Sequence, residues 1–121
     1  MEHAMSAKCP SLAHGAGLIM LAPAYYEHMI ERHVCDDRFI AMARAMGAEG
    51  DVQPCNFLTK LCALIKECGA DNLKMSDYGI RPEDFPSLAE NAMSSMKRVF
   101  LNDRVPLTKE DVIAIYSKSY K

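Results

Sequence analysis

The chain has 121 residues and a formal net charge of −2, with half of its residues hydrophobic and a quarter charged, as in one globular domain. This balance excludes a disordered chain, and the scattered lysines and arginines lack the interleaved aromatic side chains of a nucleic-acid-binding surface. The longest apolar run, residues 16–26, is broken by Pro23 and too short to cross a bilayer, so we expect one cytoplasmic domain over residues 1–121, without membrane contact.

Helical periodicity runs along the chain, and no segment alternates apolar and polar residues for long enough to predict a strand, so the predicted fold class is all-α. The first long helix is predicted over residues 14–33, with a kink at Pro23. Its predicted buried stripe comprises Leu18, Leu21, Tyr25, Met29 and Ile30.

Two further helices are predicted in the middle of the chain. One starts at Asp36 or Asp37, either of which can cap the first turn, and ends at Gly47. The other follows Pro54, ends at Gly69 and has the clearest core-facing pattern. The apolar residues of the two helices are Phe39, Ile40, Ala43 and Met46, then Phe57, Leu58, Leu61, Leu64 and Ile65.

The last third of the chain begins with turn residues over 75–86, where Pro82 can open a short helical turn. A helix is predicted over 87–96, and a loop follows it around Pro106. Thr108 with Asp111 three residues later is a capping-box pattern that starts a final helix. That helix is predicted to bury Val112, Ile115 and Tyr116.

Five cysteines form an odd set without a CxxC pair, which argues against a disulfide framework and against a zinc ribbon. Cys55 and Cys62 are seven residues apart and therefore share one face of a helix. We expect both to be reduced and to act as small buried hydrophobic side chains.

Two of the four histidines, His3 and His14, lie in sequence contexts that suggest a functional role. His14 opens a His-Gly-Ala-Gly-Leu run, in which glycines allow the backbone to approach a ligand closely. A single histidine at a helix start is more often structural, so the residues alone leave its role open. His28 and His33 lack the i, i+4 spacing of a helical metal pair, and we expect no ligand role for them.

Several segments carry a family resemblance: 1–7 (MEHAMSA), 14–18 (HGAGL), 39–47 (FIAMARAMG), 77–85 and 106–116. Together they resemble the C-terminal helical domain of the iron-containing, NAD(P)-dependent alcohol dehydrogenases, and the butanol dehydrogenase branch is the most similar. The resemblance covers nearly the whole chain. It implies a helical bundle of the dehydroquinate synthase-like C-terminal type.

The resemblance also implies roles for the two histidines. In such enzymes an aspartate and three histidines hold iron or zinc, which polarises the alcohol oxygen while hydride leaves for the nicotinamide. His14 matches a metal ligand, and His3 matches a catalytic residue that relays a proton or positions the substrate. The other ligands and the phosphate-binding loop have no counterpart in this sequence.

By the family pattern, the missing ligands and the phosphate-binding loop belong to an N-terminal nucleotide-binding domain, which is the expected partner of this chain if it is encoded separately. We expect the chain alone to be inactive and to bind neither iron (or zinc) nor NAD(P) tightly, because one imidazole is too few ligands. We also expect self-association into a homo-oligomer, since a face that normally packs on the partner domain would be exposed.

A reading from a different class stays open, namely a non-catalytic helical interaction domain with a methionine-rich contact surface. Nine methionines favour it, but most of them fall on apolar stripes and are predicted to fill the core.

Overall fold

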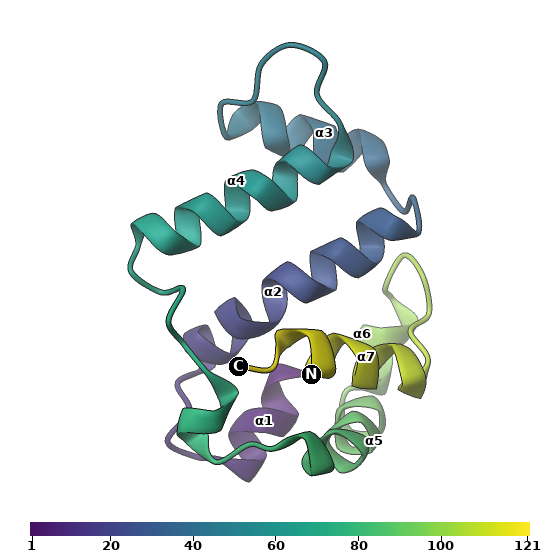
Figure 1. Ribbon diagram of the computed structural model, residues 1–121. Coiled ribbons are helices and arrows are strands. Elements are labelled where there is room, and N and C mark those ends of the chain that lie inside the picture. Colours follow the sequence, from purple (N-terminus) through teal and green to yellow (C-terminus); the bar gives the residue numbers. More distant parts are fainter. The chain divides into compact units, whose positions relative to one another are not determined.

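Helices and short 3-10 turns make up all the regular structure in the computed structural model, which describes residues 1–121 (Figure 1). The elements are α1 (Glu2–Lys8), α2 (His14–Glu31), α3 (Asp36–Ala45), α4 (Pro54–Glu67), η1 (Met75–Tyr78), η2 (Pro82–Asp84), α5 (Phe85–Ser95), α6 (Lys97–Leu101) and α7 (Lys109–Ser119). No strand forms, so the all-α class predicted from the helical periodicity is confirmed. None of these helices has the length and apolar character that crossing a membrane requires.

The chain forms two compact units, one of residues Met1–Ala22 with Leu73–Lys121 and the other of residues Pro23–Asn72. Helix α2 runs through Pro23 without interruption and contributes its first part to the first unit and its second part to the second. The expected kink at Pro23 and the expected single domain stay predictions.

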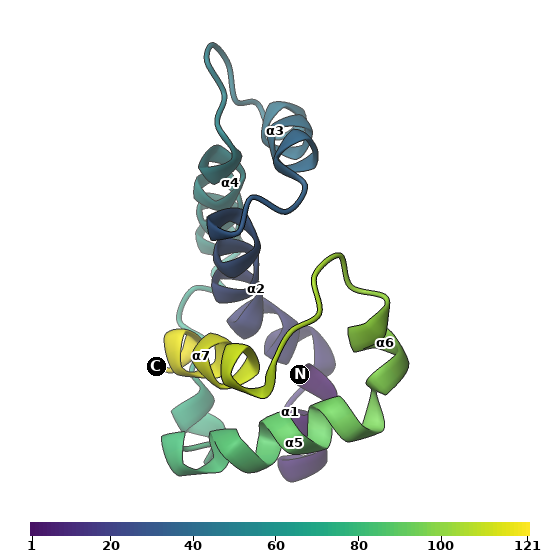
Figure 2. The same cartoon turned by 90° about the vertical axis from the view of Figure 1, so that its right-hand side faces the viewer.

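In the first unit, helix α5 packs against both α1 and α7, as the two views show (Figures 1 and 2). The ring of Phe85 stacks on that of Tyr116, with 5.7 Å between centroids. The largest fully buried side chains of the whole chain lie in this unit: Tyr116, Met5, Met75, Ile80 and Val112. This core holds α1 in place, although α1 itself is only seven residues long and was not predicted.

In the second unit, α3 and α4 lie side by side and enclose an aromatic cluster with α2 (Figure 1). The Tyr26 ring meets that of Phe57 edge-on, with 5.0 Å between centroids, and Phe57 stacks on Phe39 at 5.6 Å. Both phenylalanines are buried, as their helical spacing predicted.

The predicted helix boundaries agree with the structure to within a few residues, and the capping box of α7 is confirmed, because Thr108 accepts a hydrogen bond from the Asp111 N–H. The predicted cap of α3 is wrong. Cys35, in the left-handed conformation, occupies the N-cap, and Asp36 and Asp37 lie inside the first turn. Their charges favour the positive end of the helix dipole there without capping it.

Several side chains predicted to be buried are exposed. Leu18 is 48% exposed, and Leu64 of the apolar stripe on α4 is exposed as well. Cys55 and Cys62 are also exposed, although all five cysteines are free as expected. Periodicity identifies the apolar side of a helix, but it does not say whether a neighbouring element covers the whole of that side.

Candidate metal site

The structure brings together the two histidines that the sequence singled out. His3 lies in the first turn of α1 and His14 is the first residue of α2. A tight turn reverses the chain between them, held by the buried Leu12, whose N–H donates to the Cys9 carbonyl at 3.0 Å. The two exposed imidazole rings stack with 5.0 Å between centroids and 15° between planes.

Glu2, which no sequence pattern singled out, completes the cluster. Its side chain is buried, and one carboxylate oxygen, Oε2, is in ion-pair contact with Nδ1 of His14. The other oxygen, Oε1, accepts a hydrogen bond from the hydroxyl of Ser6, one turn further along α1. A glutamate next to a candidate site histidine is a weak signal in the sequence, because glutamates are common at exposed helix starts.

Gly17 provides the space for this carboxylate. A Cβ atom at position 17 would lie 2.7 Å from Cγ of Glu2 and 3.1 Å from its Oε1. Real Cβ atoms essentially never make a contact as short as 2.7 Å, so a side chain here would require Glu2 to shift. The glycine-rich run after His14 therefore allows a close approach of α2 to α1, as the sequence suggested for a ligand or a neighbouring element.

Tyr116 of α7 lies on the buried side of the cluster. Burial, with the charge of Glu2 as a second cause, raises the pKa of Tyr116 well above its usual range. The hydroxyl therefore stays protonated, and it donates a hydrogen bond to the carbonyl oxygen of Met1 at 2.8 Å. This hydrogen bond ties the first turn of α1, and with it Glu2 and His3, to the core of the first unit.

Potential ligand atoms of Glu2, His3 and His14 all lie within 4.8 Å of one another. Imidazole nitrogens with a carboxylate are donors that iron and zinc accept. The His14 side chain is 57% exposed, and its Nδ1 is the ring nitrogen in contact with Glu2. The donor atoms of this cluster are therefore of the kind that binds a divalent metal ion.

The remaining two histidines lie in the second unit. His33, which has a positive φ of 53°, places its Nδ1 2.9 Å from a carboxylate oxygen of Asp36. His28 is half-buried within α2. Neither belongs to the group of potential metal ligands that Glu2, His3 and His14 form.

Comparison with known proteins decides the family. The model of the Fe-containing alcohol dehydrogenase family, C-terminal, matches residues 1–120. The chain belongs to the iron-containing alcohol dehydrogenase family. The matching model describes the C-terminal domain of the family, so the resemblance noted in the sequence is confirmed at the level of the family.

Solved structures agree with this assignment of the alcohol dehydrogenase domain. It is similar to ADH/D1, an archaeal halo-thermophilic alcohol dehydrogenase from a Red Sea brine pool, with a TM-score of 0.84 and 27% sequence identity. The two matching structures are a histidine-to-alanine mutant of that enzyme and a form bound to NZQ, and their TM-scores and identities are the same. The match covers 98% of this chain but 32% of ADH/D1, so the chain spans about a third of that enzyme's length. No curated protein sequence matches the chain significantly.

Proposed function

We propose that this chain supplies the metal-site half of an NAD(P)-dependent alcohol dehydrogenase of the butanol dehydrogenase type. In this proposal His14 is a metal ligand and His3 is the catalytic residue beside it. One observation supports these roles best. The exposed imidazoles of His3 and His14 stack at the start of α2, and that of His14 contacts the buried carboxylate of Glu2. Membership of the iron-containing alcohol dehydrogenase family supports the reaction class.

The proposed chemistry assigns one task to each residue. When bound, a divalent iron or zinc ion lowers the energy of the developing alkoxide while hydride passes to NAD(P). His14 contributes a nitrogen ligand at the start of α2, and its ring contacts Glu2, for whose side chain Gly17 leaves space. The exposed ring of His3, stacked on that of His14, is proposed to exchange a proton with the substrate hydroxyl through a ring nitrogen.

The chain alone is proposed to be inactive. One imidazole cannot supply the three or so protein ligands of a catalytic metal centre, so affinity for iron or zinc is low. An N-terminal nucleotide-binding domain is the proposed partner, and it brings the remaining ligands and the NAD(P) site. We propose that the assembled enzyme acts in the cytoplasm.

The test is reconstitution. The chain is co-expressed with a nucleotide-binding domain of the family, and metal content and NAD(P)H-dependent reduction of butyraldehyde are measured. The proposal expects metal-dependent activity in the pair, absence of activity in either piece, and loss of both metal and activity in His14→Ala. His3→Gln should keep the metal and lose most of the turnover.

The matched control is His33→Asn, which removes an exposed imidazole from the second unit and retains a residue type that tolerates a positive φ. It should behave as the unaltered chain. Metal binding and activity that survive His14→Ala in the pair would refute the proposed role of His14.

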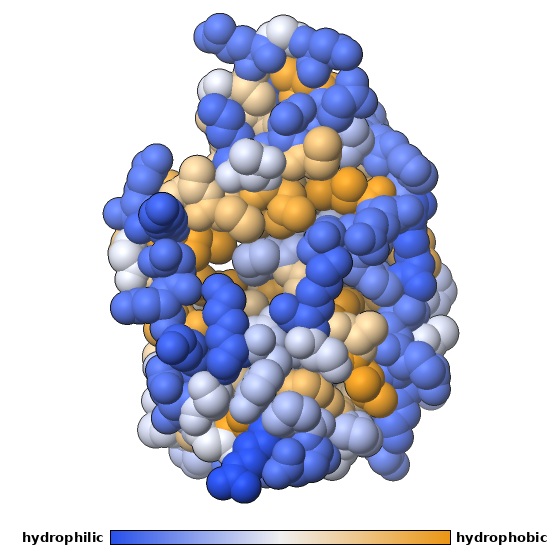
Figure 3. All heavy atoms as spheres, in the orientation of Figure 1, coloured by the Kyte–Doolittle hydropathy of each residue, from blue (hydrophilic) through white to orange (hydrophobic).

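Exposed apolar side chains support a second candidate, a protein-interaction role. Large hydrophobic residues are exposed in both units, and hydrophobic atoms are visible on the face drawn in Figure 3. These residues are Leu18, Met42, Leu64, Val99 and Leu101. Only one is a methionine, whereas Met5, Met20, Met29 and Met75 are buried, so a methionine-rich contact surface has little support.

Self-association through these residues is the corresponding proposal for the isolated chain. Sedimentation velocity over a range of concentrations tests it, with Leu18→Lys as the variant. A concentration-dependent increase in sedimentation coefficient that Leu18→Lys reduces would support a homo-oligomer, and a monomer at every concentration would exclude one.

A further inference from the structure

Glu2 is 4% exposed, although glutamate is among the side chains that proteins most often leave in water. Burial of a carboxylate is unfavourable unless its oxygens have partners. Ser6 donates to Oε1, and Nδ1 of His14 contacts Oε2, which has no hydrogen-bond partner apart from this contact. His14 is therefore the group toward which the buried carboxylate is directed.

The environment of Glu2 keeps the carboxylate in this position. Gly17 leaves the space that its Cγ and Oε1 occupy, whereas a Cβ at Gly15, two residues earlier, would meet no atom within 4 Å. The buried Tyr116 holds the preceding carbonyl, that of Met1, by its hydrogen bond. Glu2 is thus fixed on several sides before any metal ion is considered.

His14 itself is fixed much less by packing. More than half of its side chain is exposed, and the stacked ring of His3 covers only one of its faces. The contact with Glu2 is therefore the interaction that determines the rotation of the ring. Because a carboxylate oxygen is an acceptor, this contact favours the tautomer with the proton on Nδ1 and a lone pair on Nε2.

We propose that Glu2 is a positioning residue, which orients the imidazole of His14 and keeps its proton on Nδ1, so that Nε2 is the atom that binds the metal. The inference rests on the proposed function, in which His14 is a metal ligand. Carboxylates that accept a hydrogen bond from a ligand histidine fix its tautomer and orientation, and their loss weakens metal binding by roughly 10- to 100-fold.

A different arrangement would use Glu2, His3 and His14 together as three ligands of one cation, since their donor atoms lie close together. Two features disfavour it. Both oxygens of Glu2 are already engaged, and the stacked rings have nearly parallel planes. An imidazole binds a metal through a lone pair in its ring plane, so one ion does not readily lie in both planes.

The tautomer of His14 provides a direct test in the 121-residue chain without a metal. Long-range ¹H–¹⁵N correlation spectra of the imidazole nitrogens distinguish a proton on Nδ1 from one on Nε2. The proposal expects the Nδ1–H form to dominate in the unaltered chain and a mixture of the two forms in Glu2→Gln. A dominant Nε2–H form in the unaltered chain would overturn it.

A zinc titration of the same chain, followed by the same signals, tests the consequence for metal binding. Zn²⁺ should shift Nε2 of His14 first, and Glu2→Gln should weaken this binding roughly ten-fold or more. Equal affinity in the two chains, or simultaneous shifts at His3 and the Glu2 carboxylate, would overturn the positioning role.

A matched glycine pair separates positioning from general damage to the fold. Gly17→Ala should displace Glu2 and shift the tautomer toward the mixture, and Gly15→Ala should leave it unchanged. If Glu2→Gln fails to fold, Ser6→Ala replaces it, because it removes only the hydroxyl that holds Oε1. The inference would be refuted if Gly15→Ala, Gly17→Ala and Ser6→Ala all showed the same His14 tautomer populations as the unaltered chain.

The two proposals fail in different ways. If His14 has a fixed Nδ1–H tautomer but His14→Ala does not change the metal content of the reconstituted enzyme, the ligand role of His14 is refuted. If His14→Ala loses the metal but Glu2→Gln changes neither the His14 tautomer nor the zinc affinity, only the positioning role is refuted.

Discussion

The hydroxyl of Tyr116 donates a hydrogen bond of 2.8 Å to the carbonyl of Met1, which joins the last helix of the first unit to the start of α1. The next residue after that carbonyl is Glu2, and His3 follows. The two site residues on α1 therefore depend for their position on a residue that lies more than a hundred positions later in the chain.

Tyr116→Phe should lower the free energy of unfolding by about 0.5–1.5 kcal/mol, because it removes this hydrogen bond and little volume. Urea denaturation followed by circular dichroism measures the effect. The control is Tyr78→Phe, a half-buried tyrosine of η1, which should change stability by less than about 0.5 kcal/mol. Equal effects of the two substitutions would contradict the role given to the Tyr116 hydroxyl.

Gly17→Ala and Gly15→Ala should differ in stability. Alanine is preferred to glycine inside helices, so this gain of about 0.5–1 kcal/mol is available to both variants. At position 17 the new methyl group meets Glu2, and such overpacking costs about 1–3 kcal/mol. Thermal denaturation should therefore place Gly15→Ala at or above the unaltered chain and Gly17→Ala below it.

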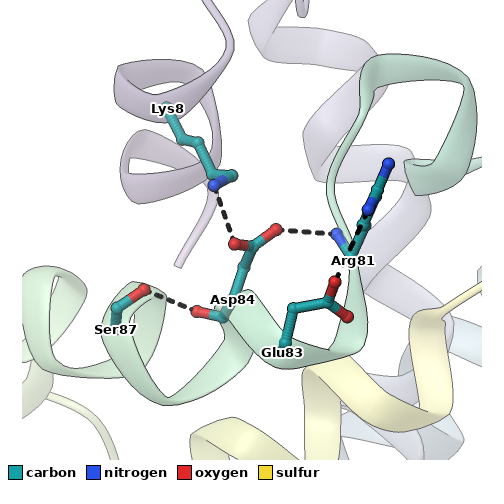
Figure 4. Close-up of polar contacts among 5 residues, drawn as sticks. All are labelled: Lys8, Arg81, Glu83, Asp84 and Ser87. Atoms are coloured by element: carbon teal, nitrogen blue, oxygen red, sulfur yellow. Dashed lines mark hydrogen bonds and ion pairs between the residues drawn. The ribbon is translucent and has the colours of Figure 1, made fainter.

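The contact between Lys8 and Asp84, which joins α1 to η2, should make stability depend on pH (Figure 4). The Lys8 ammonium lies 2.8 Å from Oδ1 of Asp84, and the Arg81 backbone N–H donates to Oδ2 at 2.8 Å. The hydrogen bond from Lys8 is the main cause that lowers the pKa of Asp84, and the hydrogen bond from the Arg81 backbone is the second. A carboxyl with a lowered pKa stabilises the folded state above its unfolded pKa and loses this contribution as the pH falls through its folded pKa.

Asp84→Asn should therefore be less stable than the unaltered chain at pH 7, by about 0.5–1 kcal/mol for this largely surface interaction. The difference should shrink as the pH falls below the ordinary aspartate value of 3.8. Glu83→Gln is the neighbouring control, because Glu83 is exposed and lies 3.7 Å from Arg81. A pH-independent effect of Asp84→Asn would show that the charge of Asp84 is not responsible.

Thr108→Ala should remove the cap of α7 and cost about 1 kcal/mol of stability, since the Asp111 N–H loses its acceptor. Thr59→Ala serves as the comparison. Thr59 is exposed within α4 and donates to the Cys55 carbonyl, so alanine there should be neutral or slightly stabilising. The free energies of unfolding of the two variants, measured in urea, should therefore differ by about 1 kcal/mol.

Local patterns were sufficient to predict most of the helices. The Thr108–Asp111 capping box, Pro54 at the start of α4 and the left-handed Gly69 at its end depend on neighbours in the sequence. The short helices α1 and α6 were missed, because five to seven residues offer too few turns for a periodic signal.

By itself, the sequence determined the helical class and the main helix boundaries, because caps, turn residues and periodicity act over a few neighbouring residues. It also singled out His3 and His14, through the glycines that follow His14 and through the family resemblance. Only the tertiary structure decided which apolar stripes are covered, as the exposed Leu18 shows, and that Glu2 is buried against His14. Burial of that carboxylate requires the space left by Gly17 and the anchor of Tyr116, which are distant in sequence and meet only when the helices pack.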